Sequence, residues 1–430
     1  MDKDQVNKMK IGIAGAGIAG LRAGIHLLQS GFAVQIFEAR SKAGGRIQSL
    51  LVDEYIIESG PEFIHGYGQE TIRLLDKYGI PYVSADGKMY IARQGGFKEN
   101  EEMIAGWDKL VSLMQTQPED LPLGEFLEKK FPGKPFAELR ARAIRFAEGF
   151  DLADPQSAST RALANEWAMG NSVSFRIPEG YHRLIDSMTD EFYSLGGQIL
   201  FEHVVDSVIW YPGEIRLSVR GNPPCKMDRL IISLPLSILN QMAPINEQIS
   251  FFPSLDPQYE ALSQIGFGTA VKIMTIWDTP FWETIIPEVQ YLFSDGFIPT
   301  WWTQYPLPTP VLAGWLGGPA AEKYSAETDA FFLEKALESL SMIFSTPVEV
   351  LQRRLKDFRV FNWKNIPWSR GAYSYSRVGA EQVRSLYRKS LEGRIYFTGE
   401  AFYDGPHPGT VEAAVVSGLE SAKLLVAELK

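Results

Sequence analysis

A glycine-rich turn near the start of the chain restricts the folds that this sequence can adopt. Gly15, Gly17 and Gly20 have G-x-G-x-x-G spacing. Residues 9–14, directly before them, are apolar and β-prone, a segment with helical periodicity follows, and a second β-prone run ends at Glu38. This order of strand, glycine turn, helix and strand predicts a dinucleotide-binding unit. It disfavours the alternative, a glycine-rich turn in another kind of α/β protein.

Each glycine of the turn has a separate predicted role. Gly15 allows a tight turn, Gly17 lets the backbone approach a pyrophosphate, and Gly20 lets the helix pack close to the strand. The free N–H groups at the start of the helix then face the phosphates. Glu38 lies 18 residues after Gly20, where its carboxylate can accept hydrogen bonds from ribose hydroxyls.

Composition excludes several classes of protein. The 430 residues favour two domains, and 45% hydrophobic with 22% charged residues is an ordinary globular composition. The net charge of −10 argues against a nucleic-acid partner. The single cysteine, Cys225, excludes an internal disulfide and a cysteine-based zinc site, and no metal is expected. No run approaches the length of a membrane span, so we expect a soluble, cytoplasmic protein that is not bound to a membrane.

Five segments, in order, resemble the flavin-containing amine oxidase family, and the resemblance extends from residue 10 to about residue 425. They are GAGIAGL with FEAR and GGRI, GPEFIHG, AVKIMTIWDTPFW, NWKNIPWSRGAYSY, and YFTGEAFYDGPHPGTVEAAVVSGLESA. The resemblance implies an α/β fold with a Rossmann-like, three-layer FAD-binding domain and an interleaved α+β substrate-binding domain on a mixed or antiparallel sheet. The expected boundaries are 1–75, 195–270 and 390–430 for the first domain, and 76–194 and 271–389 for the second, with helices over about 100–165.

The resemblance also implies a set of cofactor-binding residues. Glu38 would bind the adenosine ribose, and the Val205 backbone would contact the adenine. Arg46 would lie by the pyrophosphate or the flavin, and Glu400 would hydrogen-bond the pyrophosphate or the ribityl region. The Val411 N–H, at the start of the last helix, would face the flavin O2 edge, where a helix N-terminus stabilises negative charge. The full expected set is Gly15, Gly17, Ile18, Ala19, Gly20, Glu38, Ala39, Arg40, Gly44, Gly45, Arg46, Gly60, Pro61, Glu62, Phe63, Val205, Trp363, Gly399, Glu400, Gly409, Thr410 and Val411.

Lys272 matches the lysine that this family places near the flavin, and its ammonium would hold a water there. His65 would orient the substrate or contact the flavin, and Glu62 would receive the second ammonium of a diamine. The structural alternatives are a lysine that extends from an edge strand and a histidine that is part of the core.

Tyr373 and Trp363 match the aromatic cage that surrounds a substrate amine. Thr410 stands where the family has its second cage aromatic and is also a plausible helix N-cap. The cage is therefore one-walled, or it is completed by Trp363, Phe402 or Tyr403.

FAD should be non-covalent, because Ala372 occupies the position where some members carry the linking cysteine. The implied reaction takes hydride from the carbon next to an amine nitrogen to the flavin. It gives an aldehyde after hydrolysis and hydrogen peroxide after reoxidation by O2. A small-molecule amine of the polyamine-oxidase type is the favoured substrate, and the oligomeric state, monomer or homodimer, stays open. The alternatives are an FAD-dependent C–C desaturase, of the protoporphyrinogen-oxidase type, and a flavin-bearing binding or scaffold protein.

Overall fold

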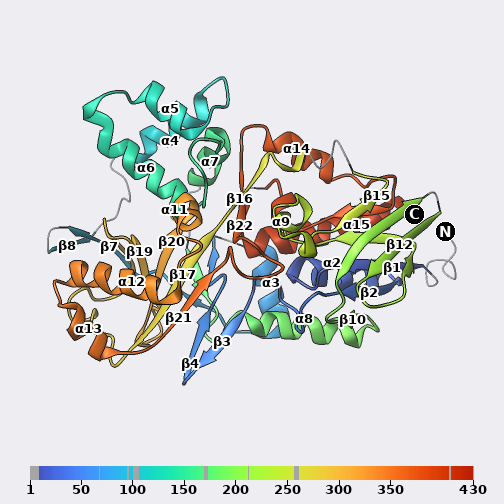
Figure 1. Ribbon diagram of the computed structural model, residues 1–430, viewed down its shortest axis with the longest axis horizontal. Helices are drawn as coiled ribbons and strands as arrows, with labels where there is room; N and C mark the ends of the chain where they lie inside the picture. The colour runs from blue at the N-terminus through green and yellow to red at the C-terminus, as the bar shows by residue number, and fades with distance from the viewer. Residues whose placement is uncertain are drawn as a thin grey trace.

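The computed structural model describes residues 9–66, 68–93, 96–99, 106–168, 173–211, 213–255, 261–405 and 408–429. Figure 1 shows an elongated molecule in which the parallel sheet and both chain ends lie at one end and a second sheet lies at the other. A cluster of helices stands above the second sheet in this view. Among the described residues, the structure contains no helix with the length and apolarity needed to cross a membrane.

The first sheet is parallel, with strand order β10-β2-β1-β14-β23. Its strands are short and mostly buried, as expected when layers cover both faces. Their bounds are Gln198–Leu200 (β10), Ala33–Phe37 (β2), Lys10–Ala14 (β1), Arg229–Ile232 (β14) and Ile395–Phe397 (β23). The glycine turn between β1 and β2 therefore lies at the carboxyl end of a central strand, where α/β sheets bind ligands.

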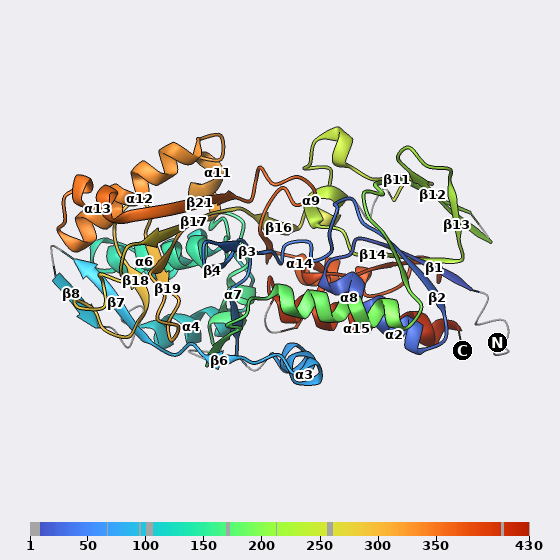
Figure 2. The same cartoon turned by 90° about the horizontal axis from the view of Figure 1, so that it is seen from below.

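Two further layers cover this parallel sheet, as Figure 2 shows. One consists of helices α2 (Ile18–Gln29), α8 (His182–Ser194) and α15 (Val411–Leu429), whose apolar residues share a core with β1 and β2. The other is a four-stranded sheet of order β13-β12-β11-β15, packed on the opposite face. Its strands span Cys225–Met227, Glu214–Val219, Val205–Tyr211 and Ser250–Phe252. The predicted three-layer Rossmann-like fold is confirmed.

The second large sheet has seven strands in the order β21-β17-β20-β19-β18-β7-β8. All neighbouring pairs are antiparallel except β18 with β7, so the predicted mixed sheet is confirmed. The strands are β21 (Leu355–Asn362), β17 (Ala270–Trp277), β20 (Val311–Gly317), β19 (Thr300–Thr303), β18 (Val289–Phe293), β7 (Lys88–Arg93) and β8 (Gly96–Glu99). Helices α11 (Gly318–Lys323), α12 (Asp329–Phe344) and α13 (Val348–Arg354) cover it, and α12 contributes most to the shared core.

The predicted helical region forms a separate core from α4 (Trp107–Thr116), α5 (Leu123–Lys130), α6 (Ala137–Gly149) and α7 (Thr160–Trp167). Smaller elements connect the two large sheets. They are β3 (Ser49–Val52), β4 (Tyr55–Glu58), β5 (Phe63–His65), α3 (Gln69–Tyr78), β6 (Val83–Ser84), β9 (Ser174–Arg176), α9 (Leu236–Leu239), β16 (Ile265–Gly268), β22 (Tyr373–Ser376), α14 (Ala380–Tyr387), and the 3-10 turns Lys134–Phe136, Ile245–Glu247 and Glu400–Phe402.

Helix α8 packs in a different domain from the one that the expected boundaries give it. The predicted boundary at residue 194 assigns it to the substrate-binding domain, but it packs against α2 beneath the parallel sheet. Its buried face carries Leu184, Ile185, Met188 and Phe192. These apolar positions fit α2 because Gly24 leaves room for the Phe192 ring.

We predict that Gly20→Ala destabilises the protein and that Gly17→Ala does not. A Cβ at Gly20 would lie 2.1 Å from the Gly15 carbonyl oxygen, whereas one at Gly17 would meet nothing within 4 Å. Denaturant unfolding should show a loss of about 2 kcal/mol for Gly20→Ala. Gly17→Ala should stay within about 0.5 kcal/mol of the parent. Equal losses for the two variants would contradict the assigned packing.

Candidate active site

Nearly all of the residues singled out from the sequence line one cavity of about 950 Å³. Its walls come from the β1–α2 turn, the end of β2, strand β17, strand β22 and the start of α15. All predicted cofactor-binding and catalytic residues line it except Gly20, which packs beneath it against Gly15 and Ser233. The volume is at the upper end for small-molecule sites.

The backbone of the β1–α2 turn fits a pyrophosphate. Gly15 has φ +103°, a conformation that favours glycine. Gly17 is the N-cap of α2, no side chain caps the helix there, and its missing Cβ leaves open space on the cavity side. The first N–H groups of α2 are therefore available to an anion.

Glu38 fits the adjoining ribose position. It is 6% exposed and lines the cavity at the end of β2. Its Oε2 accepts a hydrogen bond from the Ala16 N–H at 2.7 Å, and its Oε1 accepts one from the Arg40 N–H at 2.9 Å. Burial raises the pKa of this carboxyl above its ordinary value, against the opposing effect of these hydrogen bonds. Each oxygen keeps a lone pair for a sugar hydroxyl.

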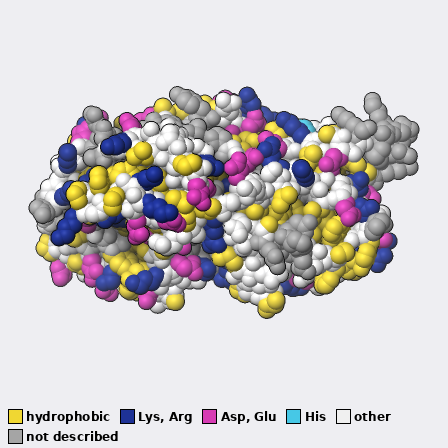
Figure 3. Space-filling view, turned by 90° about the horizontal axis from the view of Figure 1, so that it is seen from above, with side chains coloured by type: hydrophobic (Ala, Val, Ile, Leu, Met, Phe, Trp, Pro, Cys, Tyr) yellow, Lys and Arg dark blue, Asp and Glu magenta, His cyan; other side chains and the backbone are white. Residues whose placement is uncertain are grey.

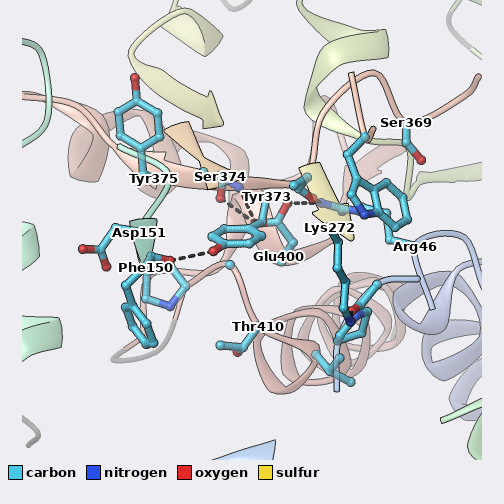
Figure 4. Close-up of a pocket in the computed structure, with 18 of the residues that line it drawn as sticks. Arg46, Phe150, Asp151, Lys272, Ser369, Tyr373, Ser374, Tyr375, Glu400 and Thr410 are labelled. Atoms are coloured by element: carbon cyan, nitrogen blue, oxygen red, sulfur yellow. Dashed lines mark hydrogen bonds and ion pairs between the residues drawn. The ribbon is translucent and has the colours of Figure 1, made fainter. Parts of the chain in front are cut away.

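Arg46 and Glu400 form an ion pair across the cavity wall (Figure 4). The Arg46 Nη1 lies 2.7 Å from Glu400 Oε1 and donates to the Ala372 carbonyl at the same distance. Glu400 Oε2 accepts from the Ser374 hydroxyl at 2.6 Å. Residues of the chain itself therefore satisfy this buried carboxylate. Its predicted contact with FAD is therefore supported by its position in the cavity lining.

Lys272 extends from β17, a strand whose residues are all buried, and is itself 1% exposed. Its Nζ donates to the Gly60 carbonyl at 3.0 Å and lies 3.1 Å from Glu62 Oε2. The same atom lies 5.4 Å from the centre of the Trp302 ring. Burial lowers the pKa of Lys272, and Glu62 opposes that effect. The side chain is thus a buried amine in the cavity wall, and not one reaching solvent from an edge strand.

Glu62 is 4% exposed and accepts hydrogen bonds on both oxygens. Gln304 Nε2 lies 3.0 Å from Oε1, and Arg176 Nη1 lies 3.3 Å from the same atom. The Trp302 Nε1 donates to Oε2, which also faces Lys272. This arrangement disfavours the diamine role predicted for Glu62, because its oxygens are already engaged by donors from the chain.

The aromatic residues of the predicted cage are held by hydrogen bonds. The Tyr373 hydroxyl donates to the Phe150 carbonyl at 2.6 Å, as Figure 4 shows, and the Trp363 indole donates to the Ser59 carbonyl at 3.0 Å. Thr410 Oγ1 accepts from the Ala413 N–H at 3.1 Å, which confirms its predicted N-cap position. These contacts fix the faces that Tyr373 and Trp363 present to the cavity.

Of the three aromatic residues that could complete the cage, two line the cavity. Trp363 and Phe402 line the cavity, and Tyr403 is not among its lining residues. The Phe402 ring also packs in the core of the parallel-sheet domain, 5.6 Å from the Phe397 ring centre. His65 lines the cavity too, with Nδ1 3.3 Å from the Ser174 hydroxyl.

Several residues in and around the cavity were not singled out from the sequence. Trp302 lines the cavity, whereas Arg176 and Gln304 are not among its lining residues, and all three contact Glu62. Arg176 reaches Glu62 because β5 places Phe63 opposite Arg176 on β9, and Trp302 and Gln304 reach it from the end of β19. No local motif carries that information. Other missed residues lie at the helical end of the cavity: Trp107, Phe146, Phe150, Asp151, Glu166 and Trp167.

Asp151 is buried and Glu166 is half-buried, and their carboxyl groups hydrogen-bond each other. The Trp167 indole donates to Asp151 Oδ2 at 2.9 Å. Burial raises the pKa of both carboxyl groups, since neither has a cation within ion-pair distance among the described residues. Figure 4 shows Asp151 beyond Phe150, on the side of Tyr373 away from Lys272. The helical end of the cavity therefore combines this carboxyl pair with aromatic side chains and with Arg142 and Arg145 of α6.

Curated relatives match nearly the whole chain in sequence. The chain is 24% identical to lysine-specific histone demethylase 1 homolog 2 of Arabidopsis thaliana, over 96% of this chain and 58% of that protein. It is 23% identical to human lysine-specific histone demethylase 2, over 99% of this chain and 54% of that protein. The chain therefore spans about half the length of the curated relatives that it matches.

Two solved oxidases have the same fold. Putrescine oxidase bound to putrescine superposes with a TM-score of 0.82 at 18% identity, covering 97% of this chain and 99% of that one. Cyclohexylamine oxidase from Brevibacterium oxydans IH-35A gives 0.81 at 18% identity, covering 98% and 99%. The sequence profile described as flavin containing amine oxidoreductase matches residues 18–426. The chain therefore belongs to the flavin-containing amine oxidoreductase family, and the predicted flavin cofactor is confirmed.

Proposed function

We propose that the chain is an FAD-dependent amine oxidase. The observation that carries this proposal is a buried lysine, Lys272, in the same cavity as a dinucleotide-binding turn. Bound FAD would supply the two-electron acceptor for hydride from the carbon next to an amine nitrogen, and O2 would then take the electrons to give hydrogen peroxide. Hydrolysis of the product iminium would give the aldehyde.

The residues of the chain would hold the cofactor and shape the substrate site. The glycine turn and Glu38 would hold the pyrophosphate and ribose, and Arg46 would add positive charge beside them. Tyr373 and Trp363 would present fixed aromatic faces that exclude water around a neutral amine.

Lys272 would act on the reoxidation of the enzyme or on amine oxidation. The Gly60 carbonyl and the Glu62 carboxylate hold its ammonium at a fixed place in the cavity wall. From there the ammonium would bind a water or stabilise developing negative charge. A buried cation in a site of low dielectric has a much stronger effect than one in water.

The substrate would be a small amine, with diamines and polyamines favoured. Asp151 and Glu166 support this preference, because they place two carboxyl groups that can ionise at the helical end of the cavity. An ammonium there would stabilise the ionised form of the pair, whose pKa values burial has raised. The names of the curated relatives point to methylated lysine as a further amine to test.

We propose that FAD is bound without a covalent link. Cys225 lies in β13, outside the residues that line the cavity, and Ala372 cannot form a thioether. Acid precipitation of the purified protein should leave all of the yellow flavin in the supernatant. Flavin that stays with the pellet would contradict this proposal.

Replacing Lys272 with Met should slow at least one half-reaction by about 100-fold while FAD stays bound. The reason is that methionine keeps the volume of the chain but removes the buried charge. Stopped-flow measurement of flavin reduction and reoxidation would separate the two steps. Lys364→Met, which removes an ion pair with Glu322 outside the cavity, is the control and should react normally. Near-normal rates in both half-reactions of Lys272→Met would remove Lys272 from the mechanism.

Replacing Asp151 with Asn should raise KM for a diamine about tenfold, equivalent to ~1.4 kcal/mol, and change KM for a monoamine much less. The parent's KM for the diamine should fall as pH rises, because the carboxyl pair with its raised pKa ionises and then attracts the second ammonium. This pH dependence should weaken in Asp151→Asn.

Steady-state kinetics over a pH series would measure both effects. Asp154→Asn, on the same loop but outside the lining of the cavity, is the matched control. Equal losses for diamine and monoamine would count against a role for Asp151 in recognising the second amino group.

A further inference from the structure

Lys272 ends in a buried cluster of charges in which a single carboxylate faces two cations. Glu62 Oε2 lies 3.1 Å from Lys272 Nζ, and Glu62 Oε1 lies 3.3 Å from Arg176 Nη1. The side chains of all three are at most 4% exposed. Leaving either cation in this place without Glu62 would bury an uncompensated charge, which is strongly destabilising.

The remaining neighbours of Glu62 require it to be ionised. Gln304 and Trp302 both donate hydrogen bonds to it, as do the two cations, so none of these contacts accepts a proton from the carboxyl group. Burial would raise the pKa of Glu62, but Lys272 and Arg176 outweigh burial and hold that pKa below its ordinary value. Glu62 is therefore a fixed negative charge at the end of the Lys272 side chain.

The Glu62 carboxylate is the charged group that contacts the Lys272 ammonium directly. The charged groups around Lys272 are Glu62, Glu58 on β4 and Arg176 on β9. Glu58 accepts from the Tyr181 N–H and the Ser49 hydroxyl and makes no ion pair with Lys272. Arg176 repels the ammonium and shares its carboxylate. Of these groups, only Glu62 binds the Lys272 ammonium directly, and the Gly60 carbonyl completes its coordination.

We propose that Glu62 is a positioning residue whose carboxylate fixes the Lys272 ammonium in the cavity wall and keeps it protonated, while Arg176 on its other oxygen limits that effect. The electrostatic part of this inference concerns the chain alone. Its consequence for catalysis rests on the proposed function, since Lys272 is the residue through which Glu62 would act.

The test is a double-mutant cycle of Glu62→Gln and Lys272→Met, measured on the FAD-loaded protein. Glutamine keeps the shape of Glu62 and removes its charge, and its amide NH2 replaces one of the two accepting oxygens. Glu62→Gln should lower the melting temperature by about 5 °C at pH 7. Adding Lys272→Met should restore part of that loss, because the unpaired ammonium is removed while Arg176 still lacks its carboxylate.

The pH dependence of the free energy of unfolding distinguishes a change in the protonation of Lys272 from a simple loss of packing. In Glu62→Gln, folded Lys272 should release its proton well below the unfolded value of about 10.4. The unfolded state then binds more protons over that interval, so the stability of this variant should rise with pH from neutrality towards pH 10. This rise in stability with pH, relative to the parent, should disappear in the double variant. Glu58→Gln, which removes a nearby carboxyl without touching Lys272, should show no rescue by Lys272→Met.

Two results would overturn the proposal. One is a loss of stability in Glu62→Gln that is the same at every pH and is not rescued by Lys272→Met. The other is an unchanged pH midpoint for reoxidation by O2 in an active Glu62→Gln enzyme, where we expect a downward shift of about 2 units. If no variant oxidises an amine, the proposed function fails, but the stability cycle still decides the role of Glu62.

Discussion

The site depends on the close packing of the last helix against the first. Gly418 of α15 lies against the backbone of Ala19 in α2, where a Cβ would approach the Ala19 carbonyl oxygen to 2.4 Å. This contact places the start of α15, at Thr410 and Val411, on the same cavity as the glycine turn. The two ends of a 430-residue chain thereby supply one binding site. Loss of this approach would separate the wall that carries Gly17 from the wall that carries Thr410.

Partners within the chain satisfy several of the buried charges that line the cavity. Backbone N–H groups hold Glu38, Arg46 holds Glu400, and Glu62 holds Lys272. Such pairing costs desolvation but fixes the charges in place, which is what electrostatic preorganisation requires. Asp151 and Glu166 differ, because in the described part of the chain they hydrogen-bond each other and Trp167 and form no ion pair. The charged groups around Lys272 are therefore paired within the chain, and the Asp151–Glu166 pair lies at the helical end of the cavity.

The sequence predicts the glycine turn of the site, because residues close together in the chain determine its conformation. The spacing of Gly15, Gly17 and Gly20 predicted a turn, an open approach and a close helix contact, and the structure has all three. The network around Glu62 could not be predicted in this way. Arg176 and Trp302 are distant from Glu62 in sequence and meet it only through the register of β5 with β9 and the position of β19. The same limit applies to α8, because its amphipathic pattern does not show which sheet it covers.

The central claim is that one cavity holds FAD and oxidises an amine beside Lys272. It is tested most directly by anaerobic titration of the purified protein, supplied with FAD, against polyamines, monoamines, amino acids and a methylated lysine peptide. The account predicts a yellow protein whose flavin absorbance is bleached by at least one amine, with diamines or polyamines acting at the lowest concentrations. A colourless protein that does not take up FAD, or a flavin that no amine bleaches, would contradict it.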